Sequence, residues 1–298
     1  MNISIVVLNY KGLKNTLECL DSLKKMDKNG HKVEIIVVDN NSRDTSKEVL
    51  SKVEDIIFLS SEKNLGYTGG NNIGIKEALR KNADFILILN NDVICDKYLL
   101  KNLVLSSKEA SIISPKILFE AGFEFHKNRY KKEQLGKVIW YAGAEIDWQN
   151  IIGVHTGVDQ VDEGQFAKAQ QIDLATGACM FVKKEVFEKI GYFDEKYFLY
   201  LEDMDFCVRS KKAGFKIHFE PKAVLWHKNA GSTGGSGSGL QDYYITRNRL
   251  LFAFKYAKLK TKIAVLKQVI AQVTQKAKRQ ALLDFLTLNF GKGNYHEN

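Results

Sequence analysis

Three carboxylates crowd into four positions in the second half of the chain: Glu202, Asp203 and Asp205. Apolar residues recur around them with helical spacing, so residues 200–209 are expected to form a helix that begins at the acids and packs one face into a core. Asp205 and Arg209 are four residues apart and are expected to pair along the helix surface. Glu202 and Asp203 then have no obvious local cation, which leaves a functional role open for them. The structural alternative is that they cap helix amides and favour the positive end of the helix dipole.

Polar residues also follow three apolar runs, at Asn9, at Asp39 and at Asn90-Asn91-Asp92. Asp39 is suited to accept hydrogen bonds from a nucleotide base or from ribose hydroxyls; the alternative is an Asx turn that leaves the strand. Asp92 would be held at the tip of a buried strand, where one carboxylate suits a hard divalent cation that bridges a diphosphate. A plain turn is the alternative for that triplet.

The elements that must position these residues are short apolar runs rich in Ile and Val, at residues 3–8, 33–38, 56–59 and 85–89. Helices are expected between them, with N-terminal signals at Asn15 and at Asp44 or Thr45, and a third helix within residues 70–81. Strands and helices that alternate at this spacing predict an α/β fold with a mostly parallel sheet flanked by helices on both faces. Ligands bind beyond the carboxyl ends of such strands, and the polar residues fall there.

The segment 64–74 is a glycine-rich entry to the third helix. Glycines let backbone amides approach a phosphate or sugar closely, and the helix N-terminus adds a positive end. The segment lacks the Lys-Ser/Thr ending of an ATP-type P-loop and is not a GxGxxG motif.

The regular alternation of predicted strands and helices ends after Pro115. Residues 119–170 mix aromatic, glycine and charged residues without a clear period, so loops and short strands are expected there, where substrate choice varies. A strand broken by small residues is predicted within 173–182, followed by a helix that Gly191 caps. Gly214 is expected to end the acidic helix.

The composition of the 298 residues, 45% hydrophobic and 27% charged, is that of a globular protein with a sizeable core. Four widely spaced cysteines without a CxxC pair indicate buried, reduced thiols and argue against a zinc site. The first residues carry no basic leader, and their apolar run is too short to span a bilayer. These features favour a cytoplasmic protein.

The net charge of +9 is concentrated in the tail, because residues 243–298 hold eleven Lys/Arg and two acids while residues 1–242 are balanced. A glycine- and serine-rich stretch at 231–239 precedes the tail and is interpreted either as a lid over a bound donor or as a tether. Beyond it, a heptad-like apolar stripe predicts one long helix, carried by Phe252, Tyr256, Leu259, Ile263, Leu266, Ile270 and Val273. Three interpretations of this helix stay open: packing on the body, a homodimer, or contact with an anionic membrane. Packing with membrane proximity is favoured, and no nucleic-acid-binding module is recognisable.

Taken together, these motifs resemble the inverting family 2 glycosyltransferases of the GT-A fold, in particular their rhamnosyltransferase-like branch. The resemblance spans about residues 3–250 and rests on the number and order of the motifs. They are Val6-Val7-Leu8-Asn9-Tyr10, Val38-Asp39-Asn40-Asn41-Ser42, Asn64-Leu65-Gly66, Asn72-Ile73-Gly74, Leu89-Asn90-Asn91-Asp92, Thr176-Gly177-Ala178, Gly191-Tyr192-Phe193-Asp194, Glu202-Asp203-Met204-Asp205 with Arg209, Trp226-His227, and Tyr243-Tyr244 with Arg247-Asn248.

The resemblance implies a Rossmann-like GT-A catalytic domain at 1–240 and a basic helical extension at 241–298. Within the catalytic domain, residues 1–115 would bind the nucleotide sugar and residues 116–240 would serve the acceptor and catalysis. The implied reaction is metal-dependent transfer, with inversion, of a sugar such as rhamnose from a nucleoside diphosphate in cell-surface polysaccharide synthesis. A sugar nucleotidyltransferase and a catalytically silent nucleotide-sugar-binding scaffold are the alternatives.

The resemblance also implies a role for each matching residue. Asp203 corresponds to the general base, with Glu202 beside it, and Asp92 corresponds to the last carboxylate of the metal-binding DxD motif. His227 resembles an additional ligand of Mg²⁺ or Mn²⁺, although a lone histidine after a tryptophan is also often structural. The triplet departs from the family pattern by having one carboxylate. Donor contacts are implied for Asn9, Asp39, Asn64, Gly66, Asn72 and Asn91, and acceptor-side or supporting roles for Thr176, Gly177, Asp205 and Arg209.

The expected partners are a dTDP- or UDP-sugar donor and a saccharide or lipid-linked acceptor. The basic tail would place a cytoplasmic enzyme peripherally at the inner face of the cell membrane, and a homodimer is a further alternative. No nucleic-acid partner is expected.

Overall fold

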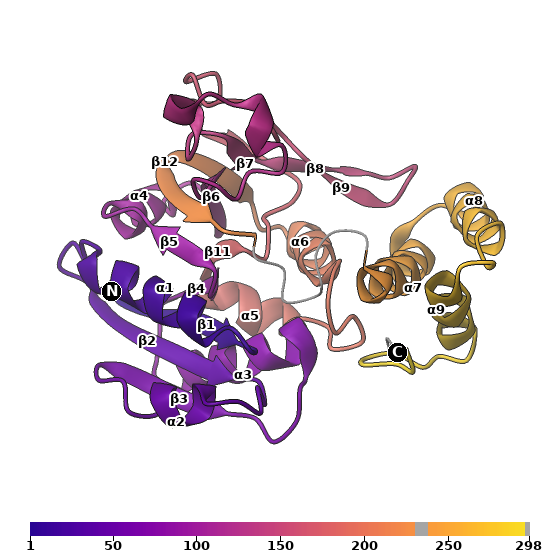
Figure 1. The fold of residues 1–298 in the computed structure, drawn as a ribbon, viewed down its shortest axis with the longest axis horizontal. Helices are drawn as coiled ribbons and strands as arrows, with labels where there is room; N and C mark the ends of the chain where they lie inside the picture. Colours follow the sequence, from indigo (N-terminus) through magenta and orange to yellow (C-terminus); the bar gives the residue numbers. More distant parts are fainter. Residues whose placement is uncertain (230–237, 296–298) are drawn as a thin grey trace.

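The computed structural model describes residues 1–229 and 238–295, and it is built around one large mixed sheet (Figure 1). Most of the glycine- and serine-rich stretch at 231–239, with its lid and tether interpretations, lies outside the described residues. The sheet runs in the order β10, β12, β6, β11, β4, β1, β2, β3, with β5 beside β12 and β7 beside β6. The strands are β1 Asn2–Asn9, β2 Lys32–Asp39, β3 Ile56–Ser60, β4 Phe85–Asn90, β5 Val93–Cys95, β6 Ile112–Phe119, β7 Ile139–Tyr141, β10 Gln170–Gln171, β11 Cys179–Lys183 and β12 Ile217–His227.

Strand direction divides the sheet into two parts. The strands β3, β2, β1 and β4 are parallel neighbours, as are β6 and β12. Strand β11 runs antiparallel between β4 and β6 and joins the two parallel groups. The predicted α/β fold with a mostly parallel central sheet is therefore confirmed, and the four N-terminal strands fall where the apolar runs predicted them.

Six helices pack with this sheet: α1 Leu13–Lys25, α2 Ser46–Leu50, α3 Gly66–Arg80, α4 Leu99–Ser106, α5 Lys184–Ile190 and α6 Glu202–Lys212. Thr45 occupies the N-cap position of α2, where Asp44 accepts from the Ser46 amide, and Gly191 caps α5, as expected. The N-terminal signal at Asn15 was wrong, because α1 begins at Leu13 and Asn15 lies inside its first turn. The physical reason is the neighbouring Thr16, whose hydroxyl donates to the side chain of Asn9 and draws the first turn against the end of β1.

The glycine-rich segment corrects a second expectation. Helix α3 already begins at Gly66, so most of the segment is helical rather than an open loop. A Cβ at Gly70 would lie 2.4 Å from a methyl of Leu8, and one at Gly74 would lie 2.3 Å from a methyl of Val6. Gly70 and Gly74 therefore let the helix lie directly on the side chains of β1, and recognition of a phosphate or sugar by the start of the segment stays a prediction.

Residues between β6 and β11 form loops, short strands and two 3₁₀ turns, as expected for 119–170. A separate hairpin of β8 Ala144–Asp147 and β9 Ile152–His155 extends toward the C-terminal helices (Figure 1). All four cysteines are buried and unpaired in disulfides, which agrees with their predicted reduced state.

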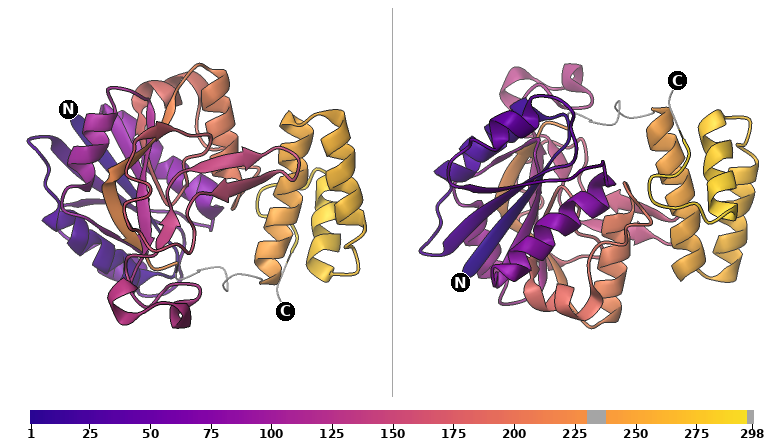
Figure 2. Two further views of the ribbon diagram at one scale, coloured as in Figure 1. Left: turned by 90° about the horizontal axis from the view of Figure 1, so that it is seen from above. Right: turned by 90° about the horizontal axis from the view of Figure 1, so that it is seen from below.

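The tail forms three helices, α7 Gly239–Tyr256, α8 Leu259–Ile270 and α9 Lys276–Leu286, and the prediction of one long helix was wrong. The chain turns at Ala257 and Lys258, both in extended conformation, so the apolar stripe does not share one face. Phe252 is fully buried, whereas Leu259 is 72% exposed. Helix α7 lies between the sheet domain and the outer pair α8 and α9 (Figure 2). Within residues 1–229 and 238–295, no helix combines the length and apolarity needed to cross a membrane.

Candidate active site

The carboxyl ends of β1 and β2 hold one buried polar network. The side-chain amide of Asn9 donates to Asp39 at 2.7 Å and to Ser42 at 3.1 Å, and the Ser42 hydroxyl donates to Asp39 at 2.5 Å. Thr16 donates to Asn9 at 2.8 Å and accepts from the Asn91 amide at 2.9 Å. Three residues predicted to contact the donor, Asn9, Asp39 and Asn91, therefore lie in one continuous network at the strand ends.

Asn64 and Gly66 lie beside this network at the start of α3. Asn40 donates to the Asn64 side chain at 3.1 Å and to the Gly66 carbonyl at 3.0 Å, which ties the end of β2 to the helix. Gly66 has a φ of 71°, and a Cβ there would lie 2.3 Å from the Phe198 carbonyl oxygen. Only glycine fits that position without moving the neighbouring loop.

Asn72 stands apart from the strand ends. Its amide nitrogen donates to the Phe193 carbonyl and to Glu195, both at 3.0 Å, and its oxygen accepts from the Phe193 amide at 3.1 Å. The amide nitrogen and the oxygen of Asn72 thus both support residues 193–195. Its predicted contact with the donor stays a prediction.

Asp92, in the turn between β4 and β5, and His227, the last residue of β12, form a close pair. The Nε2 atom of His227 lies 3.0 Å from Oδ1 of Asp92, and the imidazole is almost completely buried. Trp140 packs edge-on against the ring at 4.7 Å, and His227 Nδ1 has no hydrogen-bond partner among the described residues. Two neighbouring ligands of an octahedral cation, each bound at about 2.1 Å, are separated by about 3.0 Å, so the observed spacing fits a shared divalent ion.

No group of three or more His, Cys, Asp or Glu side chains that could hold a metal occurs in the described part of the chain. Asp92 and His227 would therefore supply two ligands only. Mg²⁺ characteristically keeps waters and substrate phosphates as its remaining ligands. The pair matches that kind of site and not a closed structural metal centre.

The acidic helix α6 begins at the acids, as predicted; Glu202 and Asp205 are buried, whereas Asp203 is half-buried. Asp203 accepts from the Gly177 amide at 3.1 Å and from the Met204 amide at 2.8 Å. Glu202 is 5% exposed, and its Oε2 atom has no hydrogen-bond partner among the described residues. Burial raises the pKa of Asp203, and burial together with the charge of Asp203 raises the pKa of Glu202 well above its usual range. Carboxylates perturbed in this way are stronger proton acceptors.

The loop at Thr176 and Gly177 links this helix to the rim of the sheet. The Asn90 amide donates to the Ala178 carbonyl at 3.0 Å, while the Gly177 amide donates to Asp203. Tyr67, which sequence reasoning missed, donates to the Gly177 carbonyl at 2.6 Å, and a Cβ at Gly177 would lie 2.9 Å from the Tyr67 hydroxyl. Asp203 is therefore anchored to the strand end that leads to Asp92. The common pocket expected for these two acids stays a prediction.

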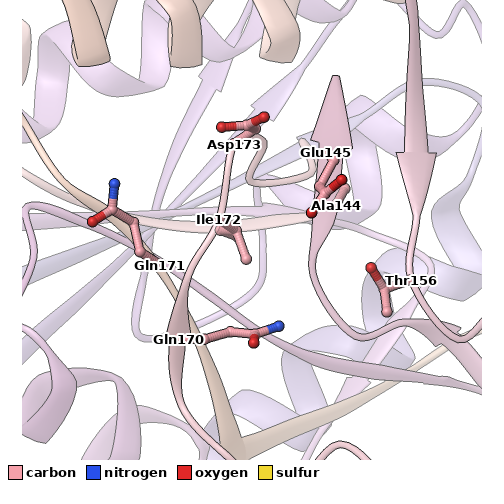
Figure 3. Close-up of a pocket in the computed structure, with 7 residues that line it drawn as sticks. All are labelled: Ala144, Glu145, Thr156, Gln170, Gln171, Ile172 and Asp173. Atoms are coloured by element: carbon pink, nitrogen blue, oxygen red, sulfur yellow. The ribbon is translucent and has the colours of Figure 1, made fainter. Parts of the chain in front are cut away.

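A cavity of about 230 Å³ lies elsewhere (Figure 3). It is lined by Ala144, Glu145, Thr156, Gln170, Gln171, Ile172 and Asp173. Gln171 pairs with His218 near the start of β12, whereas His227 is the last residue of that strand. Gln171 thus lies at the opposite end of β12 from the Asp92–His227 pair, and neither Asp92 nor His227 lines the cavity.

The predicted pair of Asp205 and Arg209 forms at 2.7 Å, but it is buried instead of lying on the surface. Asp205 also accepts from Lys255 at 2.6 Å and from Tyr256 at 2.7 Å, so α7 contributes to the pair. Burial opposes ionisation, yet the charge of Arg209 and the bonds from Lys255 and Tyr256 hold the pKa of Asp205 below its usual range. Asp205 and Arg209 therefore fix the acidic helix in place.

A change of Glu202 to glutamine is expected to stabilise the protein at neutral pH. The raised pKa means that the folded state favours the protonated acid, so its stabilising contribution is present at acid pH and is lost as pH rises through the folded pKa. Thermal melts should show the variant more stable at pH 8, by about 1–3 kcal/mol, with the difference shrinking toward pH 4. The exposed Glu188→Gln is the control. A Glu202→Gln variant that is equally or less stable at pH 8 would contradict the assignment of Glu202 as an unfavourably buried charge.

The family model described as glycosyl transferase family 2 matches residues 4–191 of the chain. The low-salt glycan biosynthesis hexosyltransferase Agl10 of Haloferax volcanii is 28% identical over 253 residues, which cover 84% of this chain and 75% of that protein. The dTDP-rhamnosyl transferase RfbF of Shigella flexneri is 26% identical over 265 residues, which cover 85% of this chain and 80% of that protein.

Solved structures with a similar fold include the mannosyltransferase PcManGT from Pyrobaculum calidifontis in complex with GDP-Man and Mn²⁺. It has a TM-score of 0.54 at 14% identity and covers 95% of this chain and 86% of that one. GalNAc-T7 with UDP, GalNAc and Mn²⁺ has a TM-score of 0.60 at 16% identity and covers 88% of this chain and 53% of that one. At these identities the likeness shows the fold alone.

Proposed function

Because this chain belongs to glycosyl transferase family 2, we propose that it transfers a hexose from a nucleoside-diphosphate donor to a hydroxyl of a saccharide or lipid-linked saccharide, with inversion. The observation that carries the proposal is the double anchoring of the Thr176–Ala178 loop. The loop binds Asp203 through Gly177 and the strand before Asp92 through Ala178. In this proposal, the loop connects the group that removes the proton with the group that binds the diphosphate. A nucleotidyltransferase or a silent scaffold has no observation in its favour.

The donor nucleotide would bind at the network of Asn9, Asp39 and Asn91, with Asn64 and Gly66 shaping its edge. Asp39 Oδ1 already accepts two short bonds, whereas Oδ2 accepts one bond of 3.3 Å, from the Ser42 amide. Oδ2 is thus the atom suited to a base N–H or a ribose hydroxyl. The similarity to a dTDP-rhamnosyl transferase supports a dTDP donor and rhamnose, and a UDP-sugar is the alternative.

Asp92 and His227 would hold Mg²⁺ or Mn²⁺ together with the donor phosphates. When bound, such an ion stabilises the negative charge that develops on the leaving diphosphate. Two structural neighbours were crystallised with Mn²⁺, which supports Mn²⁺ as the ion, while Mg²⁺ is the alternative.

Asp203 would act as the general base. As the acceptor hydroxyl attacks the anomeric carbon, its proton passes to the Asp203 carboxylate, the new C–O bond forms, and the bond to the diphosphate breaks on the opposite face. The amides of Gly177 and Met204 hold the carboxylate in one orientation for this transfer. Burial raises the pKa of Asp203 and so increases its affinity for the acceptor proton.

A screen of nucleotide sugars tests the proposal directly. A ligand that binds only the folded state raises its stability by RT ln(1 + [L]/Kd), so the true donor should raise Tm above that of the other nucleotides when Mg²⁺ or Mn²⁺ is present. The donor selected in this way is then incubated with saccharide acceptors, and the anomeric configuration of the product is determined by NMR. A product that retains the donor configuration, or no donor binding by any nucleotide sugar, would overturn the proposal.

The outer helices would bring the enzyme to an anionic membrane that carries its acceptor. Leu259, Ile263 and Ile270 are exposed and recur on one face of α8, and exposed Lys260 and Lys267 flank them. An apolar stripe bordered by lysines is typical of a helix that lies in the membrane interface. Each lysine near an anionic surface contributes about 1 kcal/mol to binding.

The protein is therefore expected to sediment with phosphatidylglycerol vesicles and not with phosphatidylcholine vesicles, and added salt should weaken the binding. The triple variant Leu259→Ser, Ile263→Ser, Ile270→Ser should lose at least about tenfold in vesicle affinity, because about 1.5–3 kcal/mol is gained for each large apolar side chain that is fully buried. Val49→Ser, an exposed apolar site on the sheet domain, is the control. If the triple variant instead converts a dimer to a monomer and leaves vesicle binding unchanged, the stripe is a subunit interface.

A further inference from the structure

The loop that leads into the acidic helix has an unusual backbone. Phe198, Tyr200 and Leu201 have φ angles of 63°, 69° and 66°, and Leu201 directly precedes Glu202 at the start of α6. Side chains with a Cβ are disfavoured in this left-handed region, so three such residues in four positions persist only where the surroundings hold them. The contacts that hold this loop therefore determine where the acids of α6 lie.

Helix α7 supplies most of those contacts through one buried asparagine. The amide nitrogen of Asn248 lies 2.8 Å from the carbonyl oxygens of Tyr197 and Leu199 and 2.9 Å from that of Tyr200. Its own oxygen accepts from Arg247 at 3.0 and 3.1 Å, which fixes the orientation of the amide. A single side chain thus binds three of the five carbonyls from Tyr197 to Leu201.

Further hydrogen bonds from α7 and α3 hold the same loop, and together with those of Asn248 they form a clamp around residues 196–200. Arg247 donates to the carbonyls of Lys196 at 3.3 Å and Tyr197 at 3.1 Å, and it is braced by the Tyr243 hydroxyl, which in turn bonds to Asp284 of α9. From the other side, the Thr68 amide of α3 donates to the Phe198 carbonyl at 3.2 Å. The loop is therefore held between the start of α3 and the C-terminal helices.

We propose that Asn248 is a positioning residue for the transfer reaction, which fixes the strained loop 197–201 and through it the place of Asp203. The inference rests on the proposed role of Asp203 as general base. Asn248 touches neither Asp203 nor the network of Asn9 and Asp39, so it acts on the proton transfer through the backbone alone. A displacement of about 1 Å at a reacting group lowers a rate by about 10²-fold.

The test compares Asn248→Ala with Arg249→Ala, whose side chain lies on the same helix but bonds to Asn150 and Gln268. Asn248→Ala is expected to lower kcat by about 10- to 100-fold, with the Kd of UDP or dTDP in Mn²⁺ changed by less than about twofold. Arg249→Ala should keep kcat within about threefold of the wild type. Asn248→Asp, which has the same size and can pair with Arg247 but has no amide donor, should repeat the loss and serves where the alanine variant does not fold.

A double-mutant cycle separates positioning from general stability. If Asn248 acts through Asp203, Asn248→Ala should lower the residual rate of Asp203→Asn by less than about threefold. An equal loss in both backgrounds, a rate no lower than that of Arg249→Ala, or a joint loss of nucleotide affinity would overturn the inference while leaving the proposed function intact. Full transfer by Asp203→Asn would instead reject the base assignment itself.

Hydrogen exchange on the wild-type protein tests, without any variant, whether α7 holds the loop. The amides of residues 198–203 and those of α7 around Asn248 should exchange with the same protection, because one set of hydrogen bonds holds both. Faster, independent exchange of the loop would show that α7 does not hold it and would overturn the inference.

Discussion

Replacement of Asp203 by asparagine is expected to lower kcat by about 10²- to 10⁴-fold, the contribution of a positioned general base. Asparagine keeps the size of the side chain and its oxygen can still accept from the Gly177 amide, so the loop should stay in place. What is lost is the capacity to take the acceptor proton. The nucleotide affinity should be unchanged, because Asp203 lies outside the network of Asn9 and Asp39.

The pH dependence supplies a second readout for the same residue. Burial raises the pKa of Asp203, so kcat of the wild type should fall as pH drops through a value above the ordinary aspartate range of about 3.9. The Asp203→Asn variant should lack that acid limb, while Asp21→Asn, at an exposed acid of α1, should retain both the rate and the limb. An unchanged limb in Asp203→Asn would assign the base to another group.

Replacement of Asp92 by alanine is expected to lower transfer by at least about 10²-fold and to abolish the effect of Mn²⁺ on nucleotide binding. The reason is the small ligand set: Asp92 is the carboxylate of a two-residue pair with His227, so the cation loses its anionic protein ligand. Calorimetric titration of UDP or dTDP with and without Mn²⁺ measures this coupling without any acceptor.

Asp96→Asn is the matched control for Asp92, because Asp96 lies four residues further along and caps the Tyr98 amide. It should keep the Mn²⁺ effect. His227→Asn should weaken metal activation less than Asp92→Ala does, since it removes a neutral ligand and leaves the carboxylate. If Asp92→Ala requires the same Mn²⁺ concentration as the wild type, the pair is a structural contact and not a metal site.

The sheet was predictable because its strands are continuous apolar runs followed by polar residues, a pattern that parallel pairing imposes. The network of Asn9, Asp39 and Asn91 follows from the same rule, since strand ends meet at one edge. Tyr67 gave no such signal, because its contact with Gly177 joins residues 110 positions apart. The glycines of α3 predicted a loop at the entry of the helix, but most of them lie inside the helix. The pattern is ambiguous because helix-to-strand packing and phosphate binding both require a residue without a Cβ.

The tail shows that apolar periodicity alone does not reveal where one helix ends and the next begins. No glycine or proline marks the break between α7 and α8, and Ala257 and Lys258 are ordinary residues that adopt extended conformations. The apolar spacing continued across the break, so the sequence indicated one helix where packing of α8 and α9 against α7 produces three. The buried setting of Asp205 was missed for the same reason, because Lys255 and Tyr256 reach it from that tail.

The contacts of Asn248 also bear on the order in which the protein is made. A ribosome that has released residues 1–240 has already delivered every proposed catalytic and metal-binding side chain, yet the backbone ahead of Glu202 still lacks its clamp. The nascent enzyme would therefore acquire competence only when α7 docks.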